Sequence, residues 1–280
     1  MENFPNKKEI RKAIQSSDVI FFDIQDVLLK RRFLWKKGLQ ELEDFKEFSG
    51  SLEKRESLLN LLLFAQDSGK RVCLVCSEGM TEQEGERILQ ECGIRGYDAL
   101  IAEPEGAAGE EIQSELCSME CKRNQKKEGG MKGGAVQSLS ICSKRRQGFY
   151  EFTDYSIAIP SIEEMYENSH YRTLMELAQN FEEKVLVNLI CTKLFDDPFY
   201  MDGEKICIRR QEDIAYAFFA PIMTAFLLWI LRVIYREKFD EVLFSSRDGY
   251  LVYKLYAKRC RTWDLVLPKG IYFYTSRKLA

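Results

Sequence analysis

Histidine is almost absent from this chain of 280 residues, in which His170 is the only one. It lies in the polar stretch ENSHYRT, where we expect it at the surface. With a single histidine in such surroundings, neither a Ser/His nor a Cys/His catalytic pair has support in the sequence.

An excess of charge of either sign is also missing. The chain has 41 basic and 44 acidic residues, and its net charge is −3. This balance gives no reason to expect a nucleic acid or an anionic membrane as a partner.

The N-terminal stretch MENFPNKKEIRKAIQSS lacks the apolar segment of a secretory signal. The nine cysteines include Cys73, Cys76 and Cys191, which lie in apolar runs and are expected to be reduced and buried. The Cys73–Cys76 pair falls in an apparent strand, and Cys117 and Cys121 have no histidine nearby, so no metal site is expected from cysteine. A cytoplasmic protein is the resulting prediction.

The first hundred residues alternate apolar strands with amphipathic helices. Strands are predicted from Val19 to Phe22, in RVCLVCS and in YDALIAEP, with helical sequence over 38–66 and after Thr81, which begins a capping box with Glu84. Short links between such elements predict an α/β fold with a parallel sheet and right-handed crossovers.

Two polar residues directly follow strands of that predicted sheet. Asp23 ends the first strand, and Ser77 ends the second. Since the carboxyl ends of parallel strands share one edge of a sheet, both side chains are expected at the edge where ligands bind.

Residues 105–148 are rich in Gly, Lys and Glu and show little periodicity. We interpret them as a flexible segment, basic over 120–147, that separates a core at 1–104 from a module at 149–280. A nucleic-acid-binding tail is the alternative, but the segment lacks interleaved aromatic residues, so a solvated linker is favoured.

The module at 149–280 is predicted to be α/β or mainly helical. It contains helices, a strand over 241–244, a polar turn at Ser245–Gly249 and a last strand in GIYFYTSRKLA. The chain stops directly after that strand, as a truncated longer protein would.

One helix in this module has no charge over the 17 residues 215–231. A membrane span needs about 20 such residues, and this stretch contains Pro221 between the flanking charges Asp213 and Arg232. A buried core helix is favoured, and a membrane helix is the alternative.

The stretch VIFFDIQDVLLKR, residues 19–31, resembles the first motif of haloacid-dehalogenase (HAD-type) phosphohydrolases. It is closest to the FDIFDTLLxR variant of predicted HAD hydrolases associated with bacterial surface-glycan glycosyltransferases. The resemblance implies a Rossmann-like core with a small helical cap, here about residues 29–66. It also implies that Asp23 is a nucleophile and a Mg²⁺ ligand, and that Ser77 binds the phosphoryl oxygen.

The sequence departs from the family's pattern at the catalytic positions. Gln25 stands where the family has its acid, and Val27 stands where threonine is usual. Asp26 is one residue too late, because alternate residues of an extended chain point in opposite directions.

The two later motifs of the family are not recognisable. Residues 103–116 contain no lysine, and no strand is followed by the metal-binding acids of a GDxxxD motif. The pair Asp196–Asp197 resembles instead a turn of the family. Asp154, Glu163 and Glu164 are the nearest acids that could substitute.

The module at 149–280 adds three similarities to the family: AYAFFAPIMTAFLLWIL, VLFSSRDGY and YFYTSRKLA. The turn Ser245, Ser246, Arg247 and Asp248 could bind an anion at a helix N-terminus. Equally, it could be a plain turn with Asp248 as the helix N-cap.

Three functions remain open at this point. The first is a HAD-type hydrolase in surface-polysaccharide biosynthesis, with impaired or lost catalysis and a phosphorylated, sugar-linked substrate. The second is a non-catalytic binding or scaffold module that partners a glycosyltransferase. The weakest is a membrane-associated protein that uses residues 215–231.

Overall fold

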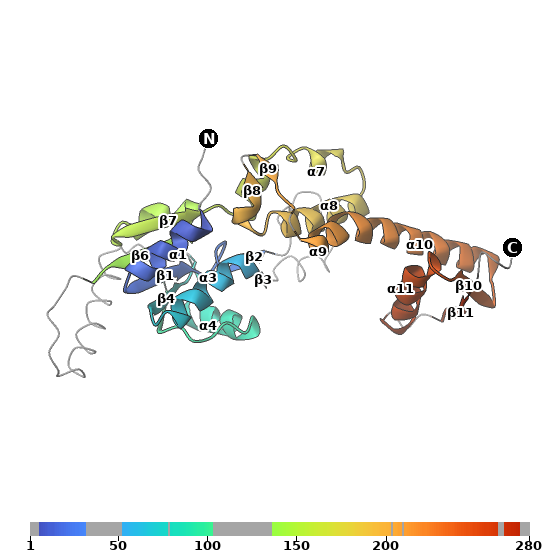
Figure 1. The fold of residues 1–280 in the computed structure, drawn as a ribbon, viewed down its shortest axis with the longest axis horizontal. Helices are drawn as coiled ribbons and strands as arrows, with labels where there is room; N and C mark the ends of the chain where they lie inside the picture. The colour runs from blue at the N-terminus through green and yellow to red at the C-terminus, as the bar shows by residue number, and fades with distance from the viewer. Residues whose placement is uncertain are drawn as a thin grey trace. The chain divides into compact units, whose positions relative to one another are not determined.

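A computed structural model describes residues 6–31, 52–77, 79–102, 136–202, 204–208, 210–262 and 266–274 (Figure 1). The chain forms two compact units, Met1–Arg209 and Arg210–Ala280. Each unit is described by itself.

The first unit is built on a five-stranded parallel sheet. Its strands lie in the order β5-β4-β1-β6-β7, which is 3-2-1-4-5 in order along the chain. This is the strand order of a Rossmann-like α/β fold, as the sequence predicts. The five strands are β1 (Val19–Asp23), β4 (Arg71–Val75), β5 (Ala99–Ile101), β6 (Ser138–Ser143) and β7 (Tyr155–Ile159).

The central strand β1 has the sequence VIFFD, and all five residues are buried. A strand inside a parallel sheet is covered on both faces, which favours such a continuous apolar run. Ile20 and Phe22 belong to the core on one face of the sheet, and Val19 and Phe21 to the core on the other.

Three helices cover the first of these faces (Figure 1). They are α1 (Lys7–Ser16), α3 (Glu56–Asp67) and α4 (Glu82–Glu91). Thr81 and Glu84 form the predicted capping box at the start of α4. The opposite face is covered by Phe149, Tyr150 and Phe152, at and just beyond the 3₁₀ helix η1 (Lys144–Tyr150).

The strand β6 and the helix η1 correct the prediction that 105–148 is a flexible linker. β6 pairs in parallel with β1 on one side and β7 on the other. Its sequence SLSICS is short and follows a Gly- and Lys-rich stretch, so only its burial between two strands marks it as a strand. Residues 105–135 of the predicted linker lie outside the described residues.

A short antiparallel hairpin follows β1, formed by β2 (Leu29–Arg31) and β3 (Leu52–Lys54). The predicted cap at 29–66 is too wide, because α3 packs on the sheet through Leu58, Leu61 and Leu62. Residues 32–51 of that predicted cap lie outside the described residues.

The remainder of the first unit is mainly helical. Its elements are α6 (Ile162–Glu167), α7 (Leu174–Leu177), α8 (Phe181–Leu194), η2 (Pro198–Tyr200), β8 (Met201–Asp202) and β9 (Lys205–Ile206). Since these elements belong to the same compact unit as the sheet, the boundary between units lies at 209/210. The predicted boundary at 148/149 is corrected accordingly.

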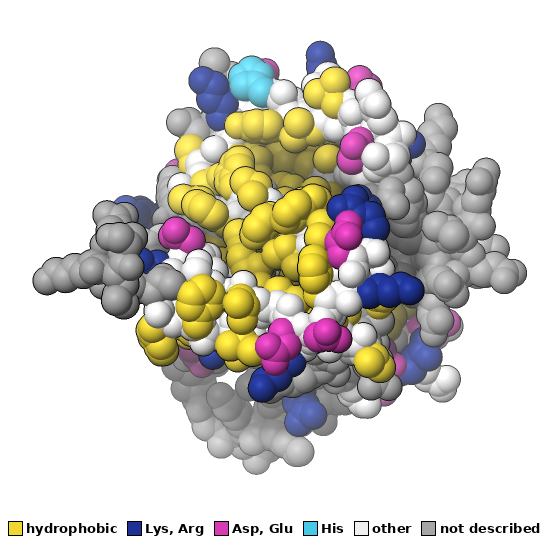
Figure 2. Space-filling model, turned by 90° about the vertical axis from the view of Figure 1, so that its right-hand side faces the viewer, with side chains coloured by type: hydrophobic (Ala, Val, Ile, Leu, Met, Phe, Trp, Pro, Cys, Tyr) yellow, Lys and Arg dark blue, Asp and Glu magenta, His cyan; other side chains and the backbone are white. Residues whose placement is uncertain are grey.

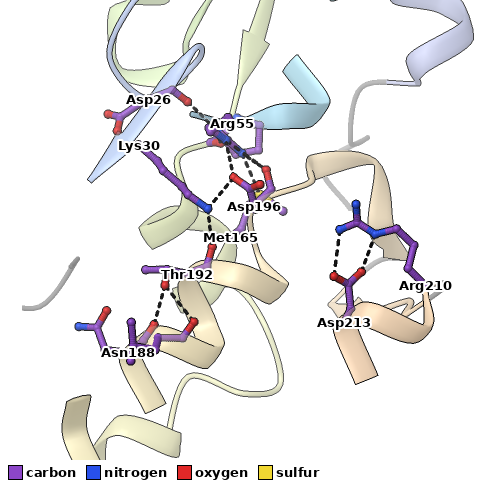
Figure 3. Close-up of polar contacts among 11 residues, drawn as sticks. Asp26, Lys30, Arg55, Met165, Asn188, Thr192, Asp196, Arg210 and Asp213 are labelled. Atoms are coloured by element: carbon purple, nitrogen blue, oxygen red, sulfur yellow. Dashed lines mark hydrogen bonds and ion pairs between the residues drawn. The ribbon is translucent and has the colours of Figure 1, made fainter. Parts of the chain in front are cut away.

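Arg55 joins the hairpin to this helical part (Figure 3). It is fully buried, and its guanidinium donates to the backbone oxygens of Asp26, Pro160 and Asp196. Lys30 Nζ lies 3.0 Å from Asp196 Oδ1 and donates to the Thr192 carbonyl at 3.1 Å. Both cations therefore hold segments more than a hundred residues apart along the chain.

The substitution Arg55→Ala should destabilise the first unit by about 3–5 kcal/mol, because it leaves the backbone oxygens of Asp26, Pro160 and Asp196 without their donor. Urea unfolding measures this loss. The exposed Arg87 in α4 provides the matched control, and Arg87→Ala should change the free energy of unfolding by less than about 0.5 kcal/mol. Similar losses for both variants would contradict the role of Arg55.

The second unit contains one long helical stretch and a small βαβ motif. The stretch comprises α9 (Gln211–Ile214), the π-helical η3 (Ala215–Phe219) and α10 (Ala220–Glu237). The parallel strands β10 (Glu241–Ser245) and β11 (Lys269–Phe273) are joined by α11 (Gly249–Thr262). Leu227, Leu231 and Ile234 pack with Phe244, Val252 and Tyr256.

The apolar helix is not the buried core helix that the sequence favours. Its most apolar 18-residue window, within Gln211–Glu237, has a mean hydropathy of 2.1, and only 17% of that window is buried. Hydrophobic side chains gather on the side of the molecule drawn in Figure 2. The exposed ones on this helix include Phe218, Phe219, Ile222, Phe226 and Trp229. By length and composition alone, the helix could cross a membrane.

Candidate functional site

The sheet has a topological switch point between β1 and β6, because the chain adds strands first on one side of β1 and then on the other. In open α/β sheets, ligands bind at the carboxyl ends of the strands that flank such a point. Asp23 ends β1 and Ser143 ends β6. The candidate site is built around these two residues.

Asp23 is fully buried, and its carboxylate is surrounded by donors. The Ser143 backbone N–H donates to Oδ2 at 2.7 Å. The Arg146 guanidinium and the Tyr150 hydroxyl both donate to Oδ1. The helix η1 thus turns back from the end of β6 and places a cation and a phenol on the carboxylate.

Aromatic rings hold Arg146 in place. Its guanidinium carbon lies 4.9 Å from the centre of the Phe149 ring and 5.9 Å from that of Tyr150. Cation–π contacts of this kind are worth about 0.5–2 kcal/mol, depending on how far they are desolvated. Arg146 is therefore oriented by three neighbours from β1 and η1.

Burial raises the pKa of the Asp23 carboxyl to about 6, although Arg146, Tyr150 and the Ser143 N–H favour its ionised form. Above that pH the carboxylate is charged and serves as the counter-ion of Arg146. The same burial, with the negative charge of Asp23, raises the pKa of Tyr150 well above its ordinary value, so the phenol remains a donor.

The chain leaves the extended conformation directly after Asp23. Asp26 has a left-handed backbone with φ 65°, and Leu29 N–H donates to the Ile24 carbonyl at 2.8 Å. The sequence pattern excludes Asp26 because alternate residues of an extended strand point in opposite directions. Since the chain is not extended here, that exclusion does not apply to Asp26. Burial raises the pKa of its carboxyl, while the nearby Arg55, Arg145 and Arg31 lower it.

Ser77 lies at the same edge of the sheet as Asp23, as expected. It follows β4 by two residues, and Asp23 pairs with Val75 at the end of that strand. Its Oγ is buried and has no hydrogen-bond partner within the described residues. The Oγ of Ser143 is likewise buried without a partner in that part of the chain.

The residues around Asp23 do not fit a Mg²⁺ site. Mg²⁺ needs several oxygen ligands, whereas the Asp23 oxygens accept from Arg146, Tyr150 and a backbone N–H. β6 is followed by the sequence KRR, where the resemblance calls for acids. Among the described residues, no group of three or more His, Cys, Asp or Glu could hold a metal ion.

The candidate substitute acids do not supply this carboxylate set. Asp154 accepts from the backbone and hydroxyl of Ser138, at the amino end of β6 and so at the opposite edge of the sheet. Arg145 Nη2 lies 3.4 Å from Glu163 Oε2, and Arg145 Nε lies 3.7 Å from Glu164 Oε1. Glu164 also belongs to the capping box of α6. Each acid is therefore engaged elsewhere.

The other acid pair and the C-terminal turn have structural roles. Asp196 pairs with Lys30, and Asp197 caps η2 by accepting from Phe199 N–H. In the turn Ser245–Asp248, Ser246 N–H donates to the Phe273 carbonyl and Arg247 N–H to the Tyr272 hydroxyl. Two amides of this turn are thus hydrogen-bonded within the second unit.

Sequence reasoning missed Arg146 and Tyr150, the two side chains that define this site. The available signal was the run KRRQGFYEF, which follows the apolar SLSIC directly and mixes basic with aromatic residues. Because this run falls at the end of the predicted linker, the sequence predicts no site there. No family model matches the chain, and no curated protein sequence matches it.

The raised pKa of Asp23 predicts how stability depends on pH. The folded protein holds this proton up to about pH 6, whereas the unfolded chain releases it near 3.8. The free energy of unfolding should therefore fall by about 3 kcal/mol, relative to Asp23→Asn, as the pH rises through that window. Urea unfolding of both proteins at several pH values measures the difference.

Asp154→Asn is the control for this comparison. Hydrogen bonds from Ser138 lower the pKa of Asp154, so its contribution to stability is lost as the pH falls and has the opposite sign. Parallel pH profiles for the wild type and Asp23→Asn would contradict the account of Asp23.

Proposed function

We propose that this chain is a non-catalytic member of the HAD-type phosphohydrolase class that binds phosphorylated ligands without hydrolysing them. The resemblance of residues 19–31 supports the class, and so does a parallel sheet with Asp23 and Ser77 at one edge. The observation that carries the loss of catalysis is the contact of Arg146, Tyr150 and Ser143 N–H with the Asp23 carboxylate.

A carboxylate that attacks phosphorus needs a lone pair directed at its target and a cation that neutralises the developing charge. At Asp23, a guanidinium, a phenol and an amide bind the oxygens and draw electron density from them. Gln25 cannot protonate a leaving group. The engaged carboxylate of Asp23 opposes attack on phosphorus, and Gln25 opposes departure of the leaving group.

The biological setting follows from the resemblance alone. The related motif occurs in predicted hydrolases associated with surface-glycan glycosyltransferases, so the ligand we propose is a phosphorylated sugar. A chain that binds such a ligand without cleaving it would act as a cytoplasmic binding or scaffold module beside a glycosyltransferase.

Purified protein should not hydrolyse p-nitrophenyl phosphate or sugar phosphates in millimolar Mg²⁺ faster than Asp23→Asn does. The reason is that the described residues around Asp23 include neither a metal-binding carboxylate set nor a general acid at the position of Gln25. Release of phosphate is measured over hours. Turnover by the wild type that disappears in Asp23→Asn would overturn the proposal and restore the hydrolase function.

A second candidate function rests on the exposed apolar helix Gln211–Glu237. We propose that it associates with a lipid bilayer, because an 18-residue window of this helix has a mean hydropathy of 2.1 and the helix exposes Phe219, Ile222 and Trp229. The purified chain should then partition into the detergent phase and sediment with phospholipid vesicles.

Ile222→Glu should reduce this partition several-fold, since a carboxylate in hydrocarbon costs about 2.5–3.5 kcal/mol or more. Leu63→Glu, at an exposed position in α3, is the matched control and should leave it unchanged. A monodisperse protein that stays in the aqueous phase would exclude this candidate.

A further inference from the structure

We propose that the Arg146 guanidinium takes the place of the family's metal ion, so that the switch-point edge binds a phosphoryl oxyanion without any divalent cation. This inference rests on the proposed function and deepens it, because it names the group that recognises the ligand. The motif at residues 19–31 implies Mg²⁺, whereas the residues around Asp23 do not fit a Mg²⁺ site.

Arg146 supplies a positive charge where the resemblance implies a metal ion. It contacts Oδ1 of Asp23, the carboxylate that the motif assigns to the metal. A guanidinium has five N–H donors in a planar fork, and it stays charged at all relevant pH values. It can therefore contact a carboxylate on one side and a phosphoryl oxygen on another.

Arg146 is more exposed than Asp23, as the binding of an anion at this site requires. The Arg146 side chain is 18% exposed, whereas the Asp23 side chain is completely buried. An approaching anion thus meets the cation, while the protein shields the carboxylate that would repel it.

Two buried hydroxyls lie at the same edge of the sheet as Asp23 and are potential neutral donors. Ser77 Oγ and Ser143 Oγ are buried, and neither has a hydrogen-bond partner within the described residues. A buried hydroxyl without a partner costs about 1–3 kcal/mol, and an oxyanion would recover that cost by accepting from it. The N–H of Ser143 donates to the Asp23 carboxylate, and Ser77 follows the neighbouring strand β4 by two residues.

Basic and acidic side chains meet around this edge of the sheet. Lys144, Arg145 and Arg146 follow one another after β6. Asp23 offsets Arg146, and Glu163 and Glu164 lie near Arg145. The guanidinium of Arg146 and the two hydroxyl donors suit a phosphate monoester better than a neutral sugar.

The experiment titrates inorganic phosphate into the full-length protein by calorimetry at pH 7.5, first in EDTA and then in Mg²⁺. We expect saturable binding in EDTA, with an affinity that Mg²⁺ changes less than twofold. Arg146→Gln should weaken binding about tenfold to a hundredfold, as expected for a lost hydrogen bond to a charged group. The exposed Arg87→Gln serves as its control and should change the affinity less than twofold.

Two further variants keep the test decisive if Arg146→Gln fails to fold. Ser77→Ala removes a hydroxyl that has no partner in the described structure, so it should weaken phosphate binding without loss of stability. Asp23→Asn removes the counter-ion of Arg146 and should strengthen binding in EDTA. Circular dichroism and urea unfolding establish that each variant is folded.

The outcomes separate the two proposals. Phosphate binding that requires Mg²⁺, or no binding by the wild type and Asp23→Asn, would overturn the metal-free site and leave the non-catalytic function intact. Equal affinities of the wild type, Ser77→Ala and folded Arg146→Gln would overturn it as well. Mg²⁺-dependent hydrolysis that requires Asp23 would overturn the non-catalytic function itself.

Discussion

The contact between the buried Asp23 carboxylate and Arg146 is the interaction on which the candidate site depends. A carboxylate without exposure at the end of a central strand needs a partner, since an unpaired buried charge costs several kcal/mol. The residues that follow β6 supply that partner as a cation, a phenol and a backbone N–H. The same contact occupies the oxygens that metal binding or nucleophilic attack would use.

A second buried network, around Arg55, holds the outer part of the first unit to the sheet. Lys30 lies in β2 of the hairpin and Arg55 directly follows β3; both contact Asp196, and Lys30 also contacts Thr192 at the end of α8. Because the hairpin directly follows the turn that carries Asp26, this network also fixes the chain beside Asp23. The two networks therefore stabilise the same edge of the sheet from different segments.

Much of the sheet could be predicted from sequence, because its strands and helices carry strong local patterns. VIFFD and RVCLV are continuous apolar runs, and Thr81 with Glu84 marks the start of α4. β6 lacked such a signal, since SLSICS is short and becomes a strand only through its pairing with β1 and β7. Arg146 lies 123 residues after Asp23, and no local pattern joins residues so far apart. The alternation of an extended strand does not predict the position of Asp26, because the chain turns at this residue with φ 65°.

A double-mutant cycle on Asp23 and Arg146 tests the central claim most directly. Asp23→Asn, Arg146→Gln and the double variant are unfolded in urea at pH 7.5, where the carboxyl of Asp23 is ionised. We predict a coupling energy of at least about 1 kcal/mol, because each residue stabilises the other's buried charge. Losses that add within about 0.3–0.5 kcal/mol would contradict the account, because Asp23 and Arg146 would then not be partners in solution.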